Sequence, residues 1–357
     1  MSFLDFFNPG AAALIGLDIS TSAIKMVELS SASAGRRLEH YVIEALPEGA
    51  VVDGEIVNLE LVVEAVKRAW KRMGTRTRGL AMAIPTASAI TRKIIVPAGL
   101  SEEELEVRVV AEANQYIPFD LEEVNLDFQV LAPTGPATDE LEVLIAAARK
   151  EKVEDRVAVA EAAGLKAVVV DVEAHAMLAG VALMEVPALD ASLTPCVAVI
   201  DIGASQMSLS VVRGDAVLYS REQRFGGMEL TLIIMRHYGV SAEEAEVMKH
   251  ARLRPADYQS AVLDNFVSMA LMEAQRALQF YQDSSMTHEI NQIRLSGGSA
   301  VIPGLAEAVA QATGVTTSLA NPFSAMTIGS AVRRARLAED APGLLIACGL
   351  ATCKGVM

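Results

Sequence analysis

The segment CVAVIDIGASQMSLSVVR, residues 196–213, runs an apolar strand into one aspartate, Asp201, bends over small residues and starts a second strand. Near the N-terminus, ALIGLDISTSAIKMVELS, residues 13–30, repeats this pattern around Asp18. A tight bend of small residues exposes several backbone N–H groups, and such a concavity suits a phosphate oxygen. The repeat has an offset much longer than that of a solenoid, so it indicates a duplicated domain with one bend in each copy.

Alignment of the two aspartates extends the duplication to the neighbouring elements. Each copy is predicted as a meander of three strands, a helix and a further βα unit. The expected strands are 13–19, 23–29 and 38–46, then 197–202, 207–213 and 216–225, with helices at 58–74 and 227–239 and βα units at 165–184 and 290–313. Apolar strands that alternate with helices indicate sheets covered on both faces. We therefore predict an α/β fold of two duplicated halves around a cleft.

Residues 86–164 interrupt this symmetry and are predicted as an inserted small α+β subdomain. Ser101 followed by Glu104 is a capping box, which marks the start of a helix. The other expected elements are a β-hairpin around 85–97, strands 123–131 and 141–147, and a helix 149–163. We accordingly predict a first half made of 1–85 and 165–190, the insert 86–164, and a second half 191–357.

Composition excludes several function classes. The 357 residues are 52% hydrophobic, carry a formal net charge of −15 and contain no long run of Lys or Arg. No nucleic-acid partner is therefore expected. The three cysteines and five histidines show no metal-ligand spacing, and no apolar run is long enough for a membrane span, so we expect a cytoplasmic protein. The stretch with Phe3, Leu4, Phe6 and Phe7 is a candidate contact with a membrane or a partner.

The two bends supply the first candidate site residues. Small hydroxyl side chains and glycines let a phosphate approach the backbone, and a lysine on the returning strand adds positive charge. The candidates are Asp18, Ser20, Thr21, Ser22 and Lys25 at the first bend, and Asp201, Gly203, Ala204 and Ser205 at the second. Asp18 and Asp201 are also candidates to hold a hydrated Mg²⁺, which prefers oxygen ligands and keeps several waters.

Two glycine pairs add candidates for the rest of a nucleotide. Gly297-Gly298, followed by Ser299, ends an apolar strand and allows close backbone approach to a purine or ribose. Gly226-Gly227 leads into a helix in the same way. Glu246 and Lys249 are three residues apart on one helix face, where they either flank a ribose or form a surface ion pair.

The order of these motifs resembles that of the actin and heat-shock ATPase superfamily. The Asp18 bend, VDVEAHA at 170–176, the Asp201 bend and Gly297-Gly298 before Pro303-Gly304 resemble its phosphate-1, connecting, phosphate-2 and adenosine motifs. LIACGLA at 345–351 resembles its second connecting helix. The resemblance implies ribonuclease H-like halves around a nucleotide cleft, with ATP and Mg²⁺ as ligands.

Within that superfamily the chain is similar to the FtsA-like branch, which has an insert at the place of residues 86–164. LIGLDISTSAIKMVEL at 14–29 and EANQYIPFDLEEVNLDFQVL at 112–131 resemble the PilM family of type IV pilus assembly proteins. This resemblance implies a cytoplasmic ATP-binding scaffold that binds the N-terminal cytoplasmic tail of an inner-membrane PilN-like protein. It also implies recruitment to the inner membrane, contacts with other pilus-machine components, and leaves self-association open.

The chain departs from the superfamily pattern where hydrolysis is concerned. Ser20 stands where many members have glycine, and Ala204-Ser205 replace a glycine-rich stretch. We therefore expect phosphate binding with weak or absent hydrolysis. Hydrolysis needs a residue that orients the attacking water, and the candidates by location are Asp171, Glu173 and Gln206.

Two other functions of this fold stay open. An FtsA-like cell-division protein that forms filaments should end in a basic amphipathic helix, whereas this chain ends in GLATCKGVM. A small-molecule kinase would use Asp201 as the base for a substrate hydroxyl, but the insert has few polar groups suited to a sugar. Fold alone does not exclude the kinase.

The segment NQYIPFDLEEV, residues 114–124, is the candidate partner site. Tyr116, Ile117 and Phe119 form an apolar cluster that the intervening proline holds extended, and Glu122 and Glu123 add negative charge. An extended peptide with apolar and basic residues matches such a groove. The alternative is that Tyr116 and Phe119 pack the insert against the first half.

Overall fold

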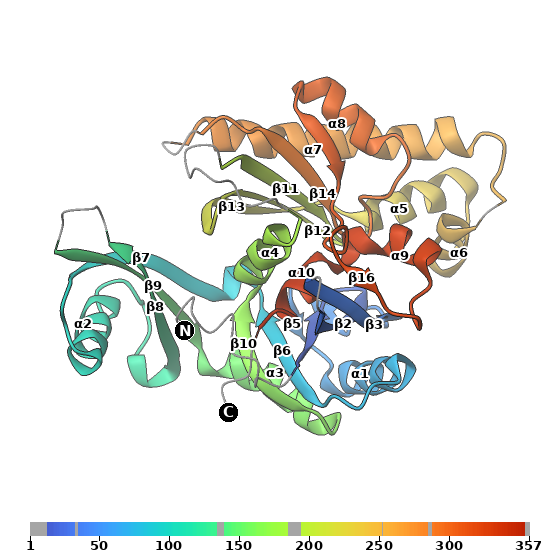
Figure 1. Ribbon diagram of the computed structural model, residues 1–357. Helices are drawn as coiled ribbons and strands as arrows, with labels where there is room; N and C mark the ends of the chain where they lie inside the picture. The colour runs from blue at the N-terminus through green and yellow to red at the C-terminus, as the bar shows by residue number, and fades with distance from the viewer. Residues whose placement is uncertain are drawn as a thin grey trace.

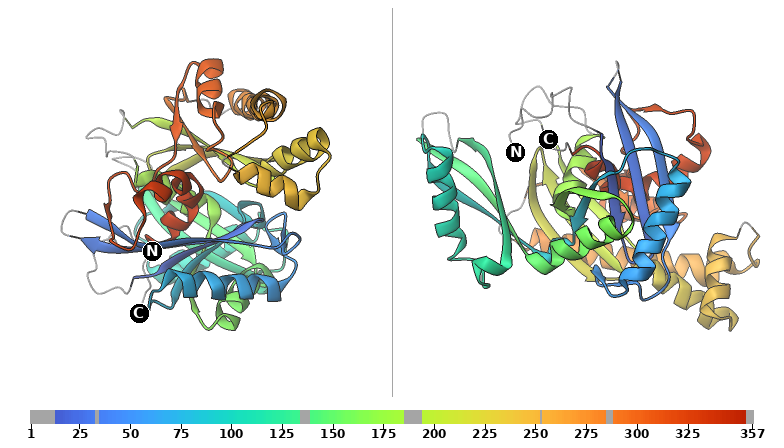
Figure 2. Two further views of the ribbon diagram at one scale, coloured as in Figure 1. Left: turned by 90° about the vertical axis from the view of Figure 1, so that its right-hand side faces the viewer. Right: turned by 90° about the horizontal axis from the view of Figure 1, so that it is seen from below.

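The computed structural model describes residues 13–32, 35–133, 139–184, 194–251, 253–284 and 288–353. Two α/β halves lie one above the other in Figure 1, and a smaller unit with its own sheet stands at one side. Figure 2 shows the same small unit apart from both halves when the molecule is seen from below. The Phe-rich stretch at residues 3–7 falls outside the described residues.

The first half is built on a six-stranded sheet with the strand order β10-β6-β1-β2-β3-β16. β1, β2 and β3 form the antiparallel meander, and β6 and β10 follow in parallel beside β1. The strands are β1 (Ile15–Ile19), β2 (Ala23–Ala32), β3 (Gly35–Ala45), β6 (Gly79–Ile84), β10 (Lys166–Val172) and β16 (Thr327–Ile328). The short hairpin β4 (Val51–Val52) and β5 (Glu55–Ile56) precedes the first helix.

The second half repeats this topology in a five-stranded sheet with the order β13-β12-β11-β14-β15. A meander of β11, β12 and β13 is again followed by two parallel strands beside its first strand. The strands are β11 (Cys196–Ile202), β12 (Gln206–Arg213), β13 (Ala216–Arg224), β14 (Gln292–Ser296) and β15 (Thr316–Leu319). The predicted duplicated α/β fold is confirmed.

Helices cover both faces of each sheet. α1 (Leu59–Met73) shows why they form where they do: Asn58 caps its N-terminus and left-handed Gly74 ends it. The first half also carries α3 (Lys150–Ala162), α4 (Glu173–Ala182), α9 (Arg334–Asp340) and α10 (Leu345–Leu350), and the second carries α5 (Gly227–Tyr238), α6 (Ala242–His250), α7 (Asp264–Gln282) and α8 (Leu305–Thr313). Short 3₁₀ turns lie at Thr86–Ser88, Leu121–Glu123 and Ala341–Leu344, and a π turn at Gln259–Leu263.

α4 and α10 cross each other between the two sheets (Figure 1). Their crossing is close because two glycines lie in it: a Cβ added at Gly349 would fall 1.8 Å from the carbonyl oxygen of Ala176. A Cβ at Gly180 would fall 2.5 Å from the carbonyl oxygen of Leu345. Met177 and Val181 of α4 share one apolar cluster with Val199 of β11 and with α10. The two helices therefore join the cores of the two halves.

The insert packs α2 (Glu102–Ala113) on a three-stranded sheet ordered β7-β9-β8. Its strands are β7 (Ala89–Pro97), β8 (Val124–Pro133) and β9 (Glu140–Arg149). The predicted capping box of Ser101 and Glu104 is confirmed. The predicted hairpin around 85–97 is wrong, because β6 pairs with β1 in the first sheet while β7 pairs with β9. α3, which we expected with the insert, packs on β6 and β10 and buries Val159 and Ala160 in the first half.

Candidate nucleotide cleft

The first bend joins β1 to β2 through Ser20, Thr21 and Ser22. The backbone N–H and the hydroxyl of Ser20 both donate to the carbonyl oxygen of Ala23, at 3.0 and 2.9 Å. This tight turn sets the strand register so that Asp18 lies opposite Lys25. Their side chains form an ion pair of 3.0 Å, and Asp18 is only 4% exposed. Lys25, predicted to project towards a phosphate, thus lies at the bend with its charge beside a buried carboxylate.

The second bend joins β11 to β12 and is closed by backbone hydrogen bonds. Gly203 N–H donates to the carbonyl oxygen of Gln206 at 2.9 Å. The start of α5 docks on the bend, because Gly227 N–H donates to the Gly203 carbonyl oxygen at 2.9 Å. A Cβ on Gly226 would fall 2.5 Å from the carbonyl oxygen of Ala204, so the contact requires a glycine. Gly226 and Gly227 therefore shape the bend itself.

The structure brings the two bends together. The hydroxyl oxygens of Thr21 and Ser205 lie 3.3 Å apart, although 184 positions separate them in the chain. A phosphate can lie between these hydroxyls only if the halves move apart slightly. The predicted facing arrangement of the two bends is present at the level of individual side chains.

Carboxylates gather around the bends. Burial and the nearby Asp18 raise the pKa of Glu173 to about 8, and Glu222 and Asp201 add to the effect. Burial likewise raises the pKa of Asp201, although Lys25 opposes the shift. For Lys25 burial acts to lower the pKa, but Asp18 and Asp201 outweigh it and the pKa is raised. Burial thus disfavours the charged form of these carboxyl groups, and a bound cation or cation-bound ligand would stabilise it.

The two glycines after β14 have different roles. Gly297 has φ +90°, and a Cβ there would fall 2.4 Å from the Ile202 carbonyl oxygen, so this glycine serves the packing of strand on strand. A Cβ at Gly298 would meet no atom within 4 Å. The open surface expected for a purine or ribose therefore lies at Gly298. The Ser299 hydroxyl donates to the Gly203 carbonyl oxygen at 3.1 Å and ties this turn to the second bend.

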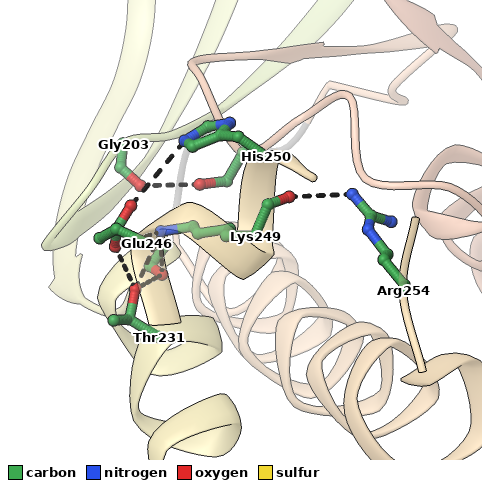
Figure 3. Close-up of polar contacts among 8 residues, drawn as sticks. Gly203, Thr231, Glu246, Lys249, His250 and Arg254 are labelled. Atoms are coloured by element: carbon green, nitrogen blue, oxygen red, sulfur yellow. Dashed lines mark hydrogen bonds and ion pairs between the residues drawn. The ribbon is translucent and has the colours of Figure 1, made fainter. Parts of the chain in front are cut away.

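Glu246 and Lys249 lie on α6 and face α5 (Figure 3). The Lys249 ammonium donates to the Gly227 carbonyl oxygen at 2.9 Å, to the Thr231 hydroxyl at 3.0 Å and to Glu246 at 3.0 Å. Of the two alternatives, the ion pair is present and all three donors of Lys249 have partners. Glu246, whose side chain is 47% exposed, is the member of the pair left open to a ribose.

The three candidates for orienting a water lie in different surroundings. Asp171 accepts from Val172 N–H at 2.7 Å and lies 3.3 Å from His175 Nδ1. Gln206 is placed by its backbone carbonyl, which closes the second bend. Glu173 alone is coupled to the carboxylates of both bends. Glu173 is therefore the candidate whose charge interacts with both bends.

Sequence reasoning missed three polar residues of the site. Ser296, fully buried at the end of β14, donates to Asp201 at 2.5 Å. Thr231 donates to Glu246 from α5. Arg156 on α3 is 3% exposed, and its charge interacts with the carboxylates of Glu173 and Asp18. A signal for Arg156 existed, because it shares a helix face with the buried Val159 and Ala160, where a charged residue is unusual.

The donor set tests the expected magnesium site. Among the residues that the structure describes, no group of three or more His, Cys, Asp or Glu side chains lies close enough to hold a metal ion. Asp18 is already paired with Lys25 and Asp201 with Ser296. Two separate carboxylates suit an ion held through its waters, as Mg²⁺ often is, but not one ligated directly by the protein.

The candidate partner segment in the insert differs in part from expectation. Ile117 is 8% exposed and belongs to the core of the insert, so its assignment to a partner surface was wrong. Tyr116 and Phe119 are 41% and 37% exposed, and each ring carries an arginine, Arg92 at 4.0 Å and Arg149 at 4.6 Å. The insert also has a hollow of about 460 Å³, lined by Val110, Ala111, Asn114, Asp120 and Leu121.

The comparisons with known proteins agree with this geometry. The model of the family "Type IV pilus assembly protein PilM" matches residues 16–354. The chain belongs to the PilM family. A solved PilM-PilN type IV pilus biogenesis complex contains a chain that is 29% identical, with a TM-score of 0.77, over 96% of this chain and 98% of that one.

A solved structure of lower identity shares this fold. The ethanolamine utilization protein EutJ from Carboxydothermus hydrogenoformans is 16% identical with a TM-score of 0.57, over 98% of this chain and 93% of that chain. MreB 5 of Spiroplasma citri, solved bound to AMPPNP, is 13% identical with a TM-score of 0.49, over 96% of this chain and 95% of that chain, too distant to inform function. Within the described part of this PilM-family chain, no helix is long and apolar enough to cross a membrane.

Proposed function

We propose that this chain is an ATP-binding scaffold of a type IV pilus machine, which works at the cytoplasmic face of the inner membrane. In this proposal it binds the N-terminal cytoplasmic tail of an inner-membrane PilN-like protein. Its membership of the PilM family and its likeness to a chain of a PilM-PilN complex support the partner. The same membership favours this function over the cell-division and small-molecule kinase alternatives.

The observation that carries the nucleotide part is the 3.3 Å contact between Thr21 and Ser205, one from each bend. Lys25 supplies a cation at the same place, and Gly298 offers open surface on the far side of the second bend. These groups fit the phosphates and the ribose or purine of ATP, with Mg²⁺ held through water by Asp18 and Asp201. A bound ATP supplies charge between the halves, and it biases their angle because the two conformations contact it differently.

Gly298→Val tests the nucleotide site. The new side chain meets no protein atom at its Cβ, so the fold should persist while the surface for the nucleotide is filled. Overpacking at a contact costs roughly 1–3 kcal/mol, so MgATP affinity measured by calorimetry should fall about tenfold or more. Ala312→Val, an exposed site on α8, is the matched control and should bind as wild type does. A folded Gly298→Val protein with unchanged affinity would place the nucleotide elsewhere.

The partner part rests on the exposed aromatic rings of the insert. We propose that Tyr116 and Phe119 contact apolar side chains of the tail and that Glu122 and Glu123 pair with its basic residues. All four side chains are at least partly exposed. Aromatic anchors typically dominate such interfaces, and rim charges mainly orient the partner.

The test is a titration of the N-terminal cytoplasmic peptide of the PilN-like protein into Tyr116→Ala, Phe119→Ala and the Glu122→Lys/Glu123→Lys double variant. Each aromatic truncation should weaken binding about tenfold, and the charge reversal should increase the dissociation constant more at low salt than at high salt. Ile95→Ala is the matched control, because Ile95 is 59% exposed on β7 and lines a second hollow of the insert. Loss of binding in the Ile95 variant alone would move the peptide to that hollow.

A further inference from the structure

Strand β13 of the second half runs along the seam with the first half. It is the edge strand of its sheet and packs against α4. Glu222 and Arg224 lie two positions apart near its end, so both side chains leave the same face of the strand. Glu222 acts electrostatically on Glu173, and Arg224 Nη2 lies 3.1 Å from Asp53 Oδ2. One face of β13 thus interacts with the first half at two points.

Asp53 occupies the tip of the β4–β5 hairpin. It has φ +49°, the one positive φ among the non-glycine residues that the structure describes, and Gly54 follows with φ +79°. Left-handed Asp-Gly is the turn that a two-residue hairpin favours. The hairpin is also held by α3 and by the turn before β7, because Glu55 pairs with Lys152 at 2.5 Å and accepts from Ser88 at 3.3 Å. These contacts hold the tip of the hairpin in place, and the tip places Asp53 beside the second half.

Arg156 fixes the same tip from inside the first half. Its Nη2 donates to the Gly54 carbonyl oxygen at 2.7 Å. Its Nη1 is buried and finds no hydrogen-bond partner among the described residues. Proteins leave few buried donors unpaired. Because the guanidinium is a rigid fork, a shift of its Nη1 group also moves the Nη2 group that holds Gly54. The carboxylates of Glu173, Glu55 and Asp18 act on this guanidinium.

We propose that Arg156 is a positioning residue that links the nucleotide cleft to a latch between the halves, the Asp53–Arg224 ion pair. One end of its fork holds the hairpin that presents Asp53, and the guanidinium lies within the field of the cleft carboxylates. A nucleotide with Mg²⁺ changes the charge around those carboxylates and so changes the hold of Arg156 on the hairpin. The latch must open for a ligand to part Thr21 and Ser205, so it slows nucleotide exchange. This inference rests on the proposed ATP binding.

The first test uses no nucleotide. Hydrogen exchange of the backbone amides of residues 50–57 is compared between wild type and Arg224→Gln, a change in the other half of the molecule. An exposed ion pair contributes little, so we expect exchange about two- to fivefold faster, and Arg224→Lys, which keeps the charge, should retain the wild-type rate. Arg236→Gln, an exposed arginine at the end of α5, is the matched control. Unchanged exchange in Arg224→Gln overturns the latch.

The second test measures dissociation of a fluorescent ATP analogue with Mg²⁺. Dissociation should be about two- to fivefold faster in Asp53→Asn and in Arg224→Gln than in wild type, should stay slow in Arg224→Lys, and should be accelerated by salt more strongly where the ion pair exists. MgATP should alter hairpin exchange in wild type and in Arg78→Met, a control arginine that donates to the Gly164 carbonyl oxygen at 2.9 Å. It should not do so in Arg156→Met or Arg156→Lys.

The outcomes separate this inference from the proposed function. If wild type binds no MgATP, the proposed function fails, and the first test still decides whether the latch exists. If wild type binds MgATP but the hairpin of both Arg156 variants responds as in wild type, the coupling role of Arg156 is overturned while ATP binding stands. Dissociation rates equal to that of wild type in Asp53→Asn and Arg224→Gln overturn the gating role.

Discussion

Glu173, the first residue of α4, is a carboxyl group held among other carboxylates. No hydrogen bond to its side chain is found within the described residues, and the charge of Arg156 acts to lower its pKa. Burial first, then Asp18, raises that pKa from 4.5 to about 8. The folded state therefore binds the proton more tightly than the unfolded state. Stability falls as pH rises from about 4.5 to about 8 and stays reduced above that range.

Glu173→Gln should remove this penalty. We expect the variant and wild type to unfold alike near pH 4 and the variant to be more stable above pH 8, by on the order of 2 kcal/mol. Urea unfolding without nucleotide at pH 4, 6 and 9 measures the difference. Glu103→Gln, on an exposed position of α2, is the control and should show no such trend. A Glu173→Gln effect of the same size at every pH would mean that the carboxyl group does not titrate in this range.

Among the elements, the crossing of α4 and α10 depends on the absence of two side chains. Glycine inside a helix normally costs about 1 kcal/mol relative to alanine, so replacement should help. Here a Cβ on Gly349 would collide with the backbone of Ala176, and one on Gly180 with the backbone of Leu345. Packing reverses the sign that helix propensity alone predicts.

Gly349→Ala should accordingly destabilise the protein by about 1–3 kcal/mol, because the helices must separate to admit the methyl group. The measurement is the midpoint of urea unfolding. Gly298→Ala is the matched control, since its new Cβ meets no atom within 4 Å, and it should unfold at nearly the wild-type midpoint. Stabilisation by Gly349→Ala would show that the crossing can relax at no cost.

In the whole molecule, the chain forms most of the first half, then the second half, and its late segments complete the first half. β16 pairs with β3, and α10 packs on β1 and β2, so residues after 320 complete the first half. α10 also shares the apolar cluster of α4 and β11. The two halves therefore have a common core between them, and their unfolding should be coupled.

Coupled unfolding has a convenient reporter in Trp70, the single tryptophan, which lies on α1 of the first half. Its fluorescence and the hydrogen exchange of β11 and β12 amides should give the same urea midpoint in wild type, within about 0.3 M. Gly180→Ala, which loosens the link, should separate the two midpoints. Two distinct midpoints in wild type would show that the halves unfold independently.

The sequence by itself determined the repeated architecture and the position of both bends. Apolar strands broken by small residues after Asp18 and Asp201 are local signals, and the same backbone rules act on both copies. The short first turn also fixes Asp18 opposite Lys25, because register follows from turn length. The capping box at Ser101 was likewise readable, since all of its hydrogen bonds lie within four residues.

Only the tertiary structure decided which residues meet. Residues 85–97 looked like a hairpin, yet residues 89–97 form the single strand β7, which pairs with β9 some fifty positions away. Ile117 looked exposed beside Tyr116 but turns into the core of the insert. Arg156 finds its partner at Gly54, about a hundred positions away, and Arg224 finds Asp53 across the seam. A local pattern specifies the direction of a chain and its buried face, whereas long-range packing selects the neighbours, and no short stretch of sequence encodes that choice.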